Sequence, residues 1–263
     1  MLVLIKGAGD LATGVAVRLY HSGFLVVMTD LPQPTAVRRT VAFSQAVYDG
    51  TAEVEGLTAR RVSGVGGVQE ALDAGEIPVL VDPTAGILGE LFFDVLVDAI
   101  LAKKNTGTHM TDAPIVLALG PGFTAGADCH GVVETMRGHD LGRLITEGSA
   151  IPNTGVPGDV GGFTAERIIR APADGPFEPL AAIGDRVELG QPVARVGDAV
   201  AAAGLTGIVR GMLPEGLSVF RGMKAGDIDP RCARSHCFTV SDKARAIGGG
   251  VLEGILLFSP QKL

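Results

Sequence analysis

The chain has 263 residues, a formal net charge of −7, and a composition that is 46% hydrophobic and 19% charged. That length suits one large domain or two modest ones with a buried core, and the composition argues against disorder. The acidic balance and the absence of Trp exclude the basic stripe and the stacking platforms of nucleic-acid binders. No apolar run reaches membrane-spanning length, no leader is expected before a strand that begins at residue 2, and the three Cys fit a reducing compartment. We therefore expect a cytoplasmic protein with neither a membrane nor a nucleic acid as partner.

The first thirty residues have the pattern of a nucleotide-binding strand, turn and helix. The apolar run Leu2 to Ile5 predicts a buried strand, and the small residues Gly7, Gly9 and Ala12 then lead into a helical periodicity. Gly7 permits a tight turn, Gly9 permits the close approach of a diphosphate, and the helix N-terminus attracts an anion. A second apolar run ends at Asp30, where such folds place a ribose-binding carboxylate.

Two features keep a second interpretation open. The glycines could simply make a tight turn between strand and helix, with Asp30 capping the next segment. Asp10 follows Gly9 directly, so its carboxylate would lie near the diphosphate unless it points away and caps the helix. We nevertheless count Asp10 among the candidate binding residues.

Further predicted strands end in loops rich in Gly, Thr and polar residues. Strands are expected at Pro78 to Val81, Asp94 to Ile100 and Pro114 to Leu119, and ligands of parallel sheets bind beyond the carboxyl ends of the strands. Arg38 could reach an anion at this rim, or it could belong to a solvated helix face. The candidate cofactor-binding residues beyond the glycine turn are Asp30, Arg38, Thr84, Asn105, Thr108, Gly120 and Gly122.

The second half of the chain predicts a β-rich domain, because short alternating segments are punctuated by Gly and Pro from about Asp128 onward. It contains a half-repeat in which Gly184, Val187 and Gly190 match the triplet 32 residues later, Gly216, Val219 and Gly222. The motif resembles one half of biotinyl/lipoyl domains, which implies a barrel-sandwich shape. The hairpin tip that would carry the cofactor has no Lys, so we expect no covalent biotin or lipoate.

The expected fold class is therefore α/β with two domains. A Rossmann-like, mostly parallel sheet domain covers residues 1–126, and a β-rich barrel-sandwich (lipoyl-like) domain covers residues 127–263. Ser241 offers an N-cap for a C-terminal helix, and its Gly248-Gly-Gly250 run suggests close packing back on the first domain.

Candidate catalytic residues lie between the two predicted domains. If residues 131–135 form a strand, His130 and Glu134 lie on the same face and could orient a ring or act as acid and base. A turn-rich hairpin with polar surface groups is the simpler interpretation, and on the residues alone it is the one we favour. Lys104 or His130 could transfer a proton in an oxidoreductase. No metal is expected, because the Cys and His residues lack paired ligand spacing.

Motifs along nearly the whole chain resemble the YqeB-type accessory proteins of the selenium-dependent molybdenum hydroxylase system, with a more distant likeness to XdhC-type factors. The resemblance implies a bacterial protein that helps to mature purine-hydroxylase-type molybdoenzymes and acts on or carries the molybdenum cofactor, but it supplies no catalytic residue. The motifs are Ile5-Lys-Gly-Ala-Gly-Asp-Leu-Ala-Thr-Gly14, Leu119-Gly-Pro-Gly-Phe123, Glu134-Thr-Met-Arg-Gly-His139, Gly226-Asp-Ile-Asp-Pro-Arg231 and the segment from Ser241 to Glu253.

Taken together, these patterns predict a binder of a dinucleotide-type cofactor, either the molybdenum cofactor or NAD(P), at the turn formed by Gly7 and Gly9. The expected partner is a molybdenum hydroxylase or its maturation machinery. Two alternatives stay open: an NAD(P)-dependent oxidoreductase in which Asp30 reads the ribose, and a non-catalytic scaffold for a molybdoenzyme.

Overall fold

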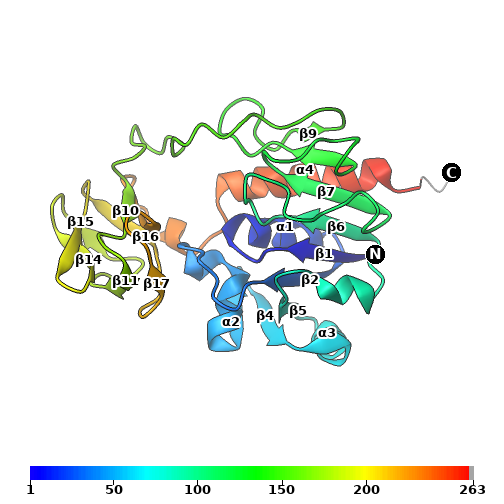
Figure 1. Ribbon diagram of the computed structural model, residues 1–263, viewed down its shortest axis with the longest axis horizontal. Helices are drawn as coiled ribbons and strands as arrows, with labels where there is room; N and C mark the ends of the chain where they lie inside the picture. Colours follow the sequence, from blue (N-terminus) through cyan, green and yellow to red (C-terminus); the bar gives the residue numbers. More distant parts are fainter. Residues whose placement is uncertain (261–263) are drawn as a thin grey trace. The chain divides into compact units, whose positions relative to one another are not determined.

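A computed structural model describes residues 1–260 and divides the chain into two compact units (Figure 1). The first unit comprises Met1–Pro34, Ala42–Thr154 and the chain from Val240 onward, and the second comprises Thr35–Val41 and Gly155–Thr239. The domain boundary expected at residue 126 therefore lies inside the first unit. The C-terminal segment, which was expected to belong to the second domain, is part of the first unit.

The first unit is built on a nine-stranded sheet with the order β3-β4-β5-β2-β1-β6-β7-β8-β9. Its central strands are continuous runs of Val, Ile and Leu that are buried on both faces, which is typical of parallel strands. The strands are β1 Leu2–Lys6, β2 Leu25–Asp30, β3 Thr51–Val54, β4 Leu57–Val62, β5 Ile77–Val81, β6 Val95–Asp98, β7 Ile115–Leu119, β8 Gly131–Val133 and β9 Leu144–Ile145.

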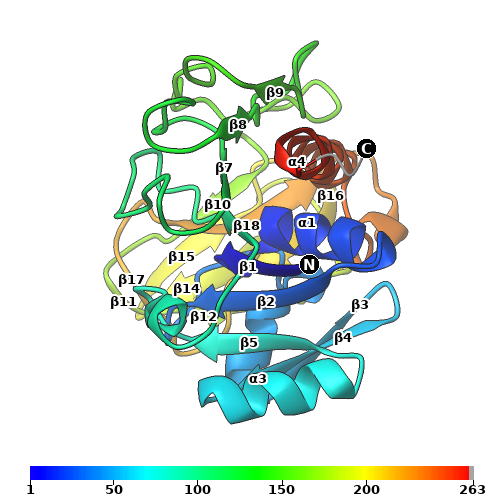
Figure 2. The same ribbon diagram turned by 90° about the vertical axis from the view of Figure 1, so that its right-hand side faces the viewer.

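Two of the helices of this unit, α1 and α4, lie side by side (Figure 2). The hydroxyl of Ser241 accepts a hydrogen bond from the Ala244 amide and so caps the start of α4. The helices are α1 Asp10–His21, α2 Ala46–Asp49, α3 Gly64–Asp73 and α4 Asp242–Phe258, with short 3₁₀ turns η2 Phe43–Gln45 and η3 Gly86–Gly89.

Glycines allow α4 to approach its neighbours closely. A Cβ added at Gly14 of α1 would lie 2.5 Å from the Ala244 Cβ, and one added at Gly250 would lie 2.1 Å from the Gly142 carbonyl oxygen. Real Cβ atoms essentially never approach so closely, so the packing of α4 depends on the missing side chains. The stability that glycine costs inside a helix is offset here by this contact.

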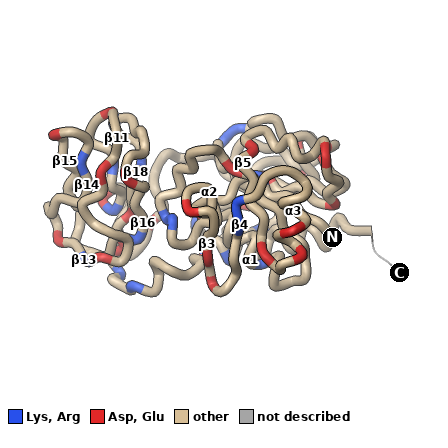
Figure 3. Tube along the Cα trace, turned by 90° about the horizontal axis from the view of Figure 1, so that it is seen from below, with Lys and Arg blue, Asp and Glu red and all other residues tan. Residues whose placement is uncertain are grey.

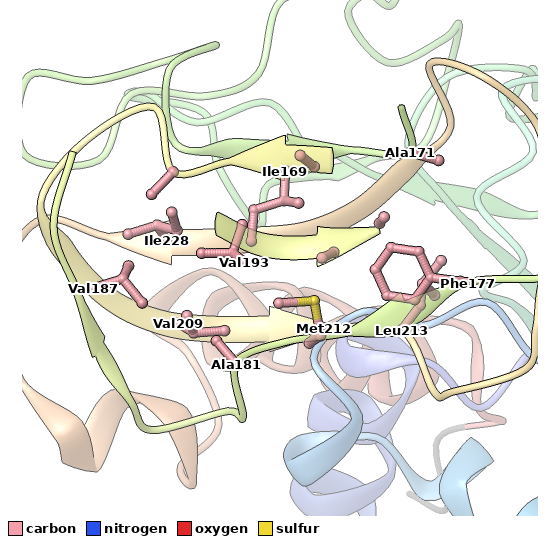
Figure 4. Packing of buried hydrophobic residues seen from close by; sticks show 14 of the residues in the cluster. Ile169, Ala171, Phe177, Ala181, Val187, Val193, Val209, Met212, Leu213 and Ile228 are labelled. Carbon is pink, nitrogen blue, oxygen red and sulfur yellow. The ribbon is translucent and has the colours of Figure 1, made fainter. Parts of the chain in front are cut away.

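The second unit consists of short strands around its own apolar core (Figure 4). Phe177, Val193, Val209, Met212 and Leu213 are among the core side chains. Its elements are η1 Arg39–Val41, β10 Ile168–Arg170, β11 Gly175–Pro176, β12 Glu178–Pro179, β13 Arg186–Val187, β14 Pro192–Val196, β15 Ala199–Ala202, β16 Gly207–Met212, β17 Ser218–Val219, β18 Lys224–Asp229 and η4 Arg234–Cys237.

The fold class expected from the sequence is wrong as stated, although an α/β core is present. The large sheet is mixed, because β3 and β9 at its two edges run antiparallel to their neighbours. Between β5 and β8 the chain crosses the sheet with no α-helix in residues 82–130, whereas a Rossmann fold has a crossover helix after each strand. The α/β core is therefore not a Rossmann domain.

The lipoyl-like barrel-sandwich is also not supported, because the second unit holds three separate sheets of four, two and three strands. The two halves of the repeat do not take equivalent places: β13 pairs with β16, and β17 pairs with β11. Gly184 and Gly216 have φ values of +100° and +79°. The repeated motif therefore specifies local turns, and it does not specify which strands pair.

Charged residues of both signs are interspersed along the trace of each unit (Figure 3). Among residues 1–260, no helix combines the length and the apolarity needed to cross a bilayer.

Candidate functional site

Loops from much of the first unit meet at the carboxyl edge of its sheet. β4, β5, β2, β1, β6, β7 and β8 all run parallel, so the segments that follow them emerge at one edge. The sheet therefore brings the glycine turn, Asp30, and the loops after β5, β6 and β7 to one side of this unit. We refer to this set of loops as the carboxyl edge.

The glycine turn forms a tight connection between β1 and α1. Gly7 has a φ of +96°, and an added Cβ would lie 2.9 Å from the Ala99 carbonyl oxygen. Both the backbone conformation and the lack of space therefore exclude a side chain at this position. Gly9 is the N-cap of α1 and makes no side-chain capping bond. Gly9, Asp10 and Leu11 are partly exposed. The amides of the first helical turn have no acceptor within the helix, so they can donate to an anion.

Asp30 lies directly beside this turn. One carboxylate oxygen accepts the Ala8 amide at 2.9 Å, and the other accepts the Leu31 amide at 2.7 Å. Burial raises the pKa of Asp30, and these two backbone hydrogen bonds oppose that shift. Each oxygen keeps one lone pair, so the carboxylate can still accept a hydrogen bond from a hydroxyl group of a ligand.

The chain itself covers part of the turn. Thr13 accepts the Phe43 amide at 2.8 Å and donates to the Ala8 carbonyl at 3.2 Å, and the Ser44 amide donates to that same carbonyl. Ala8 and Ala12 are buried as a result. Ala12 therefore has a packing role, and Gly9 to Leu11 is the stretch that remains open to a ligand.

A buried polar triad, which we did not expect from the sequence, lies at the same edge. The Lys6 ammonium donates to Thr108 Oγ1 at 2.6 Å, and Thr108 Oγ1 donates to Asp98 Oδ2 at 2.6 Å. Lys6 Nζ lies 3.8 Å from that Asp98 oxygen, and the side chains of Lys6 and Asp98 are 6% and 1% exposed. Lys6 and Asp98 end β1 and β6 and are register partners. A charged residue closing an apolar strand was the signal that could have revealed them.

The loop between β6 and β7 holds the triad in place. The side-chain oxygen of Asn105 accepts hydrogen bonds from the backbone amides of Gly107 and Thr108. The side-chain amino group of Asn105 donates to the backbone carbonyl of Thr108. An added Cβ at Gly122 would lie 2.5 Å from the Lys104 amide nitrogen. Asn105 and Gly122 thus order this loop, and only Thr108 brings a side chain to the triad.

The other candidate binding residues have structural roles or lie elsewhere. Gly120 packs against Thr135, whose hydroxyl would lie 2.5 Å from an added Cβ. Thr84 is exposed in the loop after β5. Arg38 belongs to the second unit, where its guanidinium donates to the carbonyls of His236 and Thr239. Arg38 and the loops of the carboxyl edge therefore belong to different units.

The proposed acid–base pair is not formed. His130 precedes β8 and Glu134 follows it, so their Cα atoms are about 13 Å apart along an extended chain. His130 Nδ1 accepts the Val116 amide at 3.0 Å, and the Glu134 carboxylate accepts the amides of Met136 and Ile151. Sharing one strand face therefore did not bring the two side chains together. Lys104 lies in the loop after β6, and its charged group has no assigned role.

The fold and this edge define a two-unit α/β protein with buried charge at the carboxyl end of its sheet. No family model matches the chain. Over 260 residues, which is 99% of this chain, it is 53% identical to the uncharacterized protein YqeB of Escherichia coli (strain K12). The chain is therefore similar to this relative along almost all of its own length. The chain spans about half the length of this relative, namely 48% of it.

Two solved structures are distant matches. An aspartoacylase family protein from Mesorhizobium loti is 12% identical with a TM-score of 0.30, and a succinylglutamate desuccinylase/aspartoacylase from Rhodobacter sphaeroides is 16% identical with a TM-score of 0.28. Each comparison covers 86% of this chain and 84% of the other. Scores this low support no inference about activity.

Proposed function

We propose that this protein binds the diphosphate of a dinucleotide-type cofactor at the carboxyl edge of its first unit, and that it does so in the maturation of selenium-dependent molybdenum hydroxylases. The cofactor is the molybdenum cofactor or NAD(P). The hydroxylase or its maturation machinery is the partner. The maturation role depends on the motif resemblance, and the cofactor site depends on the contacts at the glycine turn.

The observation that carries the site is the combination of partly exposed amides at Gly9 to Leu11 with the Asp30 carboxylate beside them. The amides and the positive end of the helix dipole suit a diphosphate. Asp30 suits a ribose hydroxyl, because one lone pair on each oxygen remains after its two backbone bonds. Lys6 adds a cation to the same edge; its ammonium donates one hydrogen bond to Thr108 Oγ1 and has further N–H donors.

Gly9 offers a clean test of this site. Its φ of −70° is open to any residue, so a substitution there causes no left-handed strain and blocks the approach of a ligand instead. We expect Gly9→Val to weaken the binding of NADPH or of molybdopterin cytosine dinucleotide by roughly tenfold or more, which is about 1.4 kcal/mol. Calorimetric titration of the purified protein measures the change.

The matched control is Gly66→Val, because Gly66 is exposed and an added Cβ there meets nothing within 4 Å. Asp30→Ala should weaken binding of the ribose-containing ligands and leave inorganic pyrophosphate unaffected. If neither dinucleotide binds, or if Gly9→Val binds as tightly as the control, the proposed site is wrong.

A further inference from the structure

A cavity of about 400 Å³ lies among the loops around β8 and β9 of the first unit. Leu144 and Ile145 of β9 contribute apolar surface to it, and Glu134, Asp140 and Glu147 contribute carboxylates. The volume is in the range of small-molecule sites. Glu134 directly follows β8, so this side of the cavity lies at the carboxyl end of that strand.

Glu134 is a preorganised acceptor in this cavity. Glu134 is only 2% exposed. Its two carboxylate oxygens accept hydrogen bonds from the backbone amides of Met136 at 2.7 Å and Ile151 at 2.8 Å. An ionised carboxylate has about four lone-pair sites, so each oxygen retains one. Because the two backbone bonds fix the carboxylate in place, it can accept two parallel hydrogen bonds at little further entropic cost.

The charges around the cavity select against an anion. Its lining holds three carboxylates and one guanidinium, that of Arg143, which already pairs with Asp140 at 3.0 Å. A phosphate group would be repelled there, whereas a neutral group rich in N–H donors would be accepted. The apolar side chains of Leu144 and Ile145 suit the face of a flat ring.

We propose that this cavity binds a 2-amino-4-oxopyrimidine ring, the donor pattern shared by guanine and pterins, with the ring N–H and the amino group donating to Glu134. The inference deepens the proposed function and rests on its molybdenum-cofactor form, because neither ring of NAD(P) has this donor pattern: the cavity takes the heterocyclic end of the ligand whose diphosphate lies at the glycine turn. β8 is three strands from β1, or about 14 Å across the sheet, which an extended dinucleotide spans.

Guanosine and inosine test the ring specificity, because they differ only in the 2-amino group and carry no phosphate. We expect guanosine to bind at least about tenfold more tightly than inosine, since a buried acceptor left unpaired penalises the ligand that lacks the donor. Calorimetric titration of the full chain measures both affinities. Equal affinity for the two nucleosides, or no binding of guanosine, would overturn the inference.

Two variants place the ring in the cavity. Glu134→Gln should remove the preference for guanosine, but it also disturbs two backbone hydrogen bonds. Thr146→Trp is the gentler change, because Thr146 is exposed and lines the cavity, and the indole should fill it and abolish guanosine binding. Thr51→Trp is its control, an exposed threonine on β3 at the opposite edge of the sheet.

The same protein samples separate this inference from the proposed function. Pyrophosphate binding that Gly9→Val weakens and Thr146→Trp leaves unchanged reports on the glycine turn alone. If pyrophosphate binds in this way but Thr146→Trp still binds guanosine normally, the cavity assignment is wrong and the proposed function stands. If guanosine binds selectively but no diphosphate binds, the proposed function is wrong, and with it the assignment of the cavity to the far end of that ligand.

Discussion

The two units bury charge in different ways. In the first unit, one ammonium and one carboxylate, Lys6 and Asp98, are bridged by Thr108 at the edge where loops meet. In the second unit, Asp227 is held by both Arg167 and Arg210 on adjoining strands and loops, with its side chain 1% exposed. The first arrangement leaves N–H donors on Lys6, whereas the second satisfies both oxygens of Asp227 with guanidinium groups.

Asp229 extends the network of the second unit. Arg231 donates to its two oxygens at 2.9 and 2.7 Å, and Arg210 lies 3.3 Å from one of them. Burial acts to raise the pKa of Asp229, but the hydrogen bonds and charges of Arg231 and Arg210 outweigh it and lower the pKa to about 2. Buried charge is therefore not by itself a sign of a ligand site. A carboxylate whose two oxygens are both paired holds a fold together, and donors left over at a loop-built edge are what a ligand can use.

Removal of Asp227 should give the largest effect, because it leaves the buried Arg167 guanidinium without its carboxylate and leaves Arg210 with only Asp229, at 3.3 Å. We expect Asp227→Ala to destabilise the second unit by about 3–5 kcal/mol. Hydrogen–deuterium exchange at β16 and β18, beside a denaturant titration, measures this loss. Asp198→Ala removes an exposed carboxylate from the same unit and should have little effect. If the two variants were equally stable, the network would not be what holds this unit together.

Close packing of the helix α4 is a feature of the first unit. Gly250→Ala places a Cβ 2.1 Å from the Gly142 carbonyl oxygen, so we expect a loss of about 2–3 kcal/mol from overpacking. At the neighbouring Gly249 an added Cβ meets nothing within 4 Å, so Gly249→Ala should instead stabilise the helix by up to about 1 kcal/mol. Thermal unfolding of the pair checks the sign of each change. A stabilising Gly250→Ala would contradict the close packing of α4.

Acid should affect the second unit through Asp229. The pKa of Asp229 is about 2 in the folded protein, against the ordinary 3.8 of an aspartate, so its contribution to stability is fully present above pH 3.8 and is lost as the pH falls through about 2. The shift corresponds to about 2 kcal/mol. Stability measured from pH 5 to pH 1.5 should fall less steeply in Asp229→Asn than in the unchanged protein. Parallel pH profiles for the two proteins would count against this role of Asp229.

The sequence alone determined the local elements of the first unit. The apolar runs located β1, β2, β5 and β7 to within a residue or two, and the Ser241 cap located the start of α4. These signals are local, because burial of a strand and satisfaction of a helix end depend on nearby residues. The gathering of loops at the carboxyl edge followed from them, since parallel strands place their carboxyl ends together.

Only the tertiary structure decided which residues meet. Lys6, Asp98 and Thr108 are up to 102 residues apart in sequence, and no local pattern pairs them. His130 and Glu134 are near in sequence, yet they lie at opposite ends of β8. The half-repeat in the second unit specified turns, while strand pairing sent its two halves to different sheets. Contacts between distant segments depend on how whole elements pack, and the periodicity of a single segment carries no information about that.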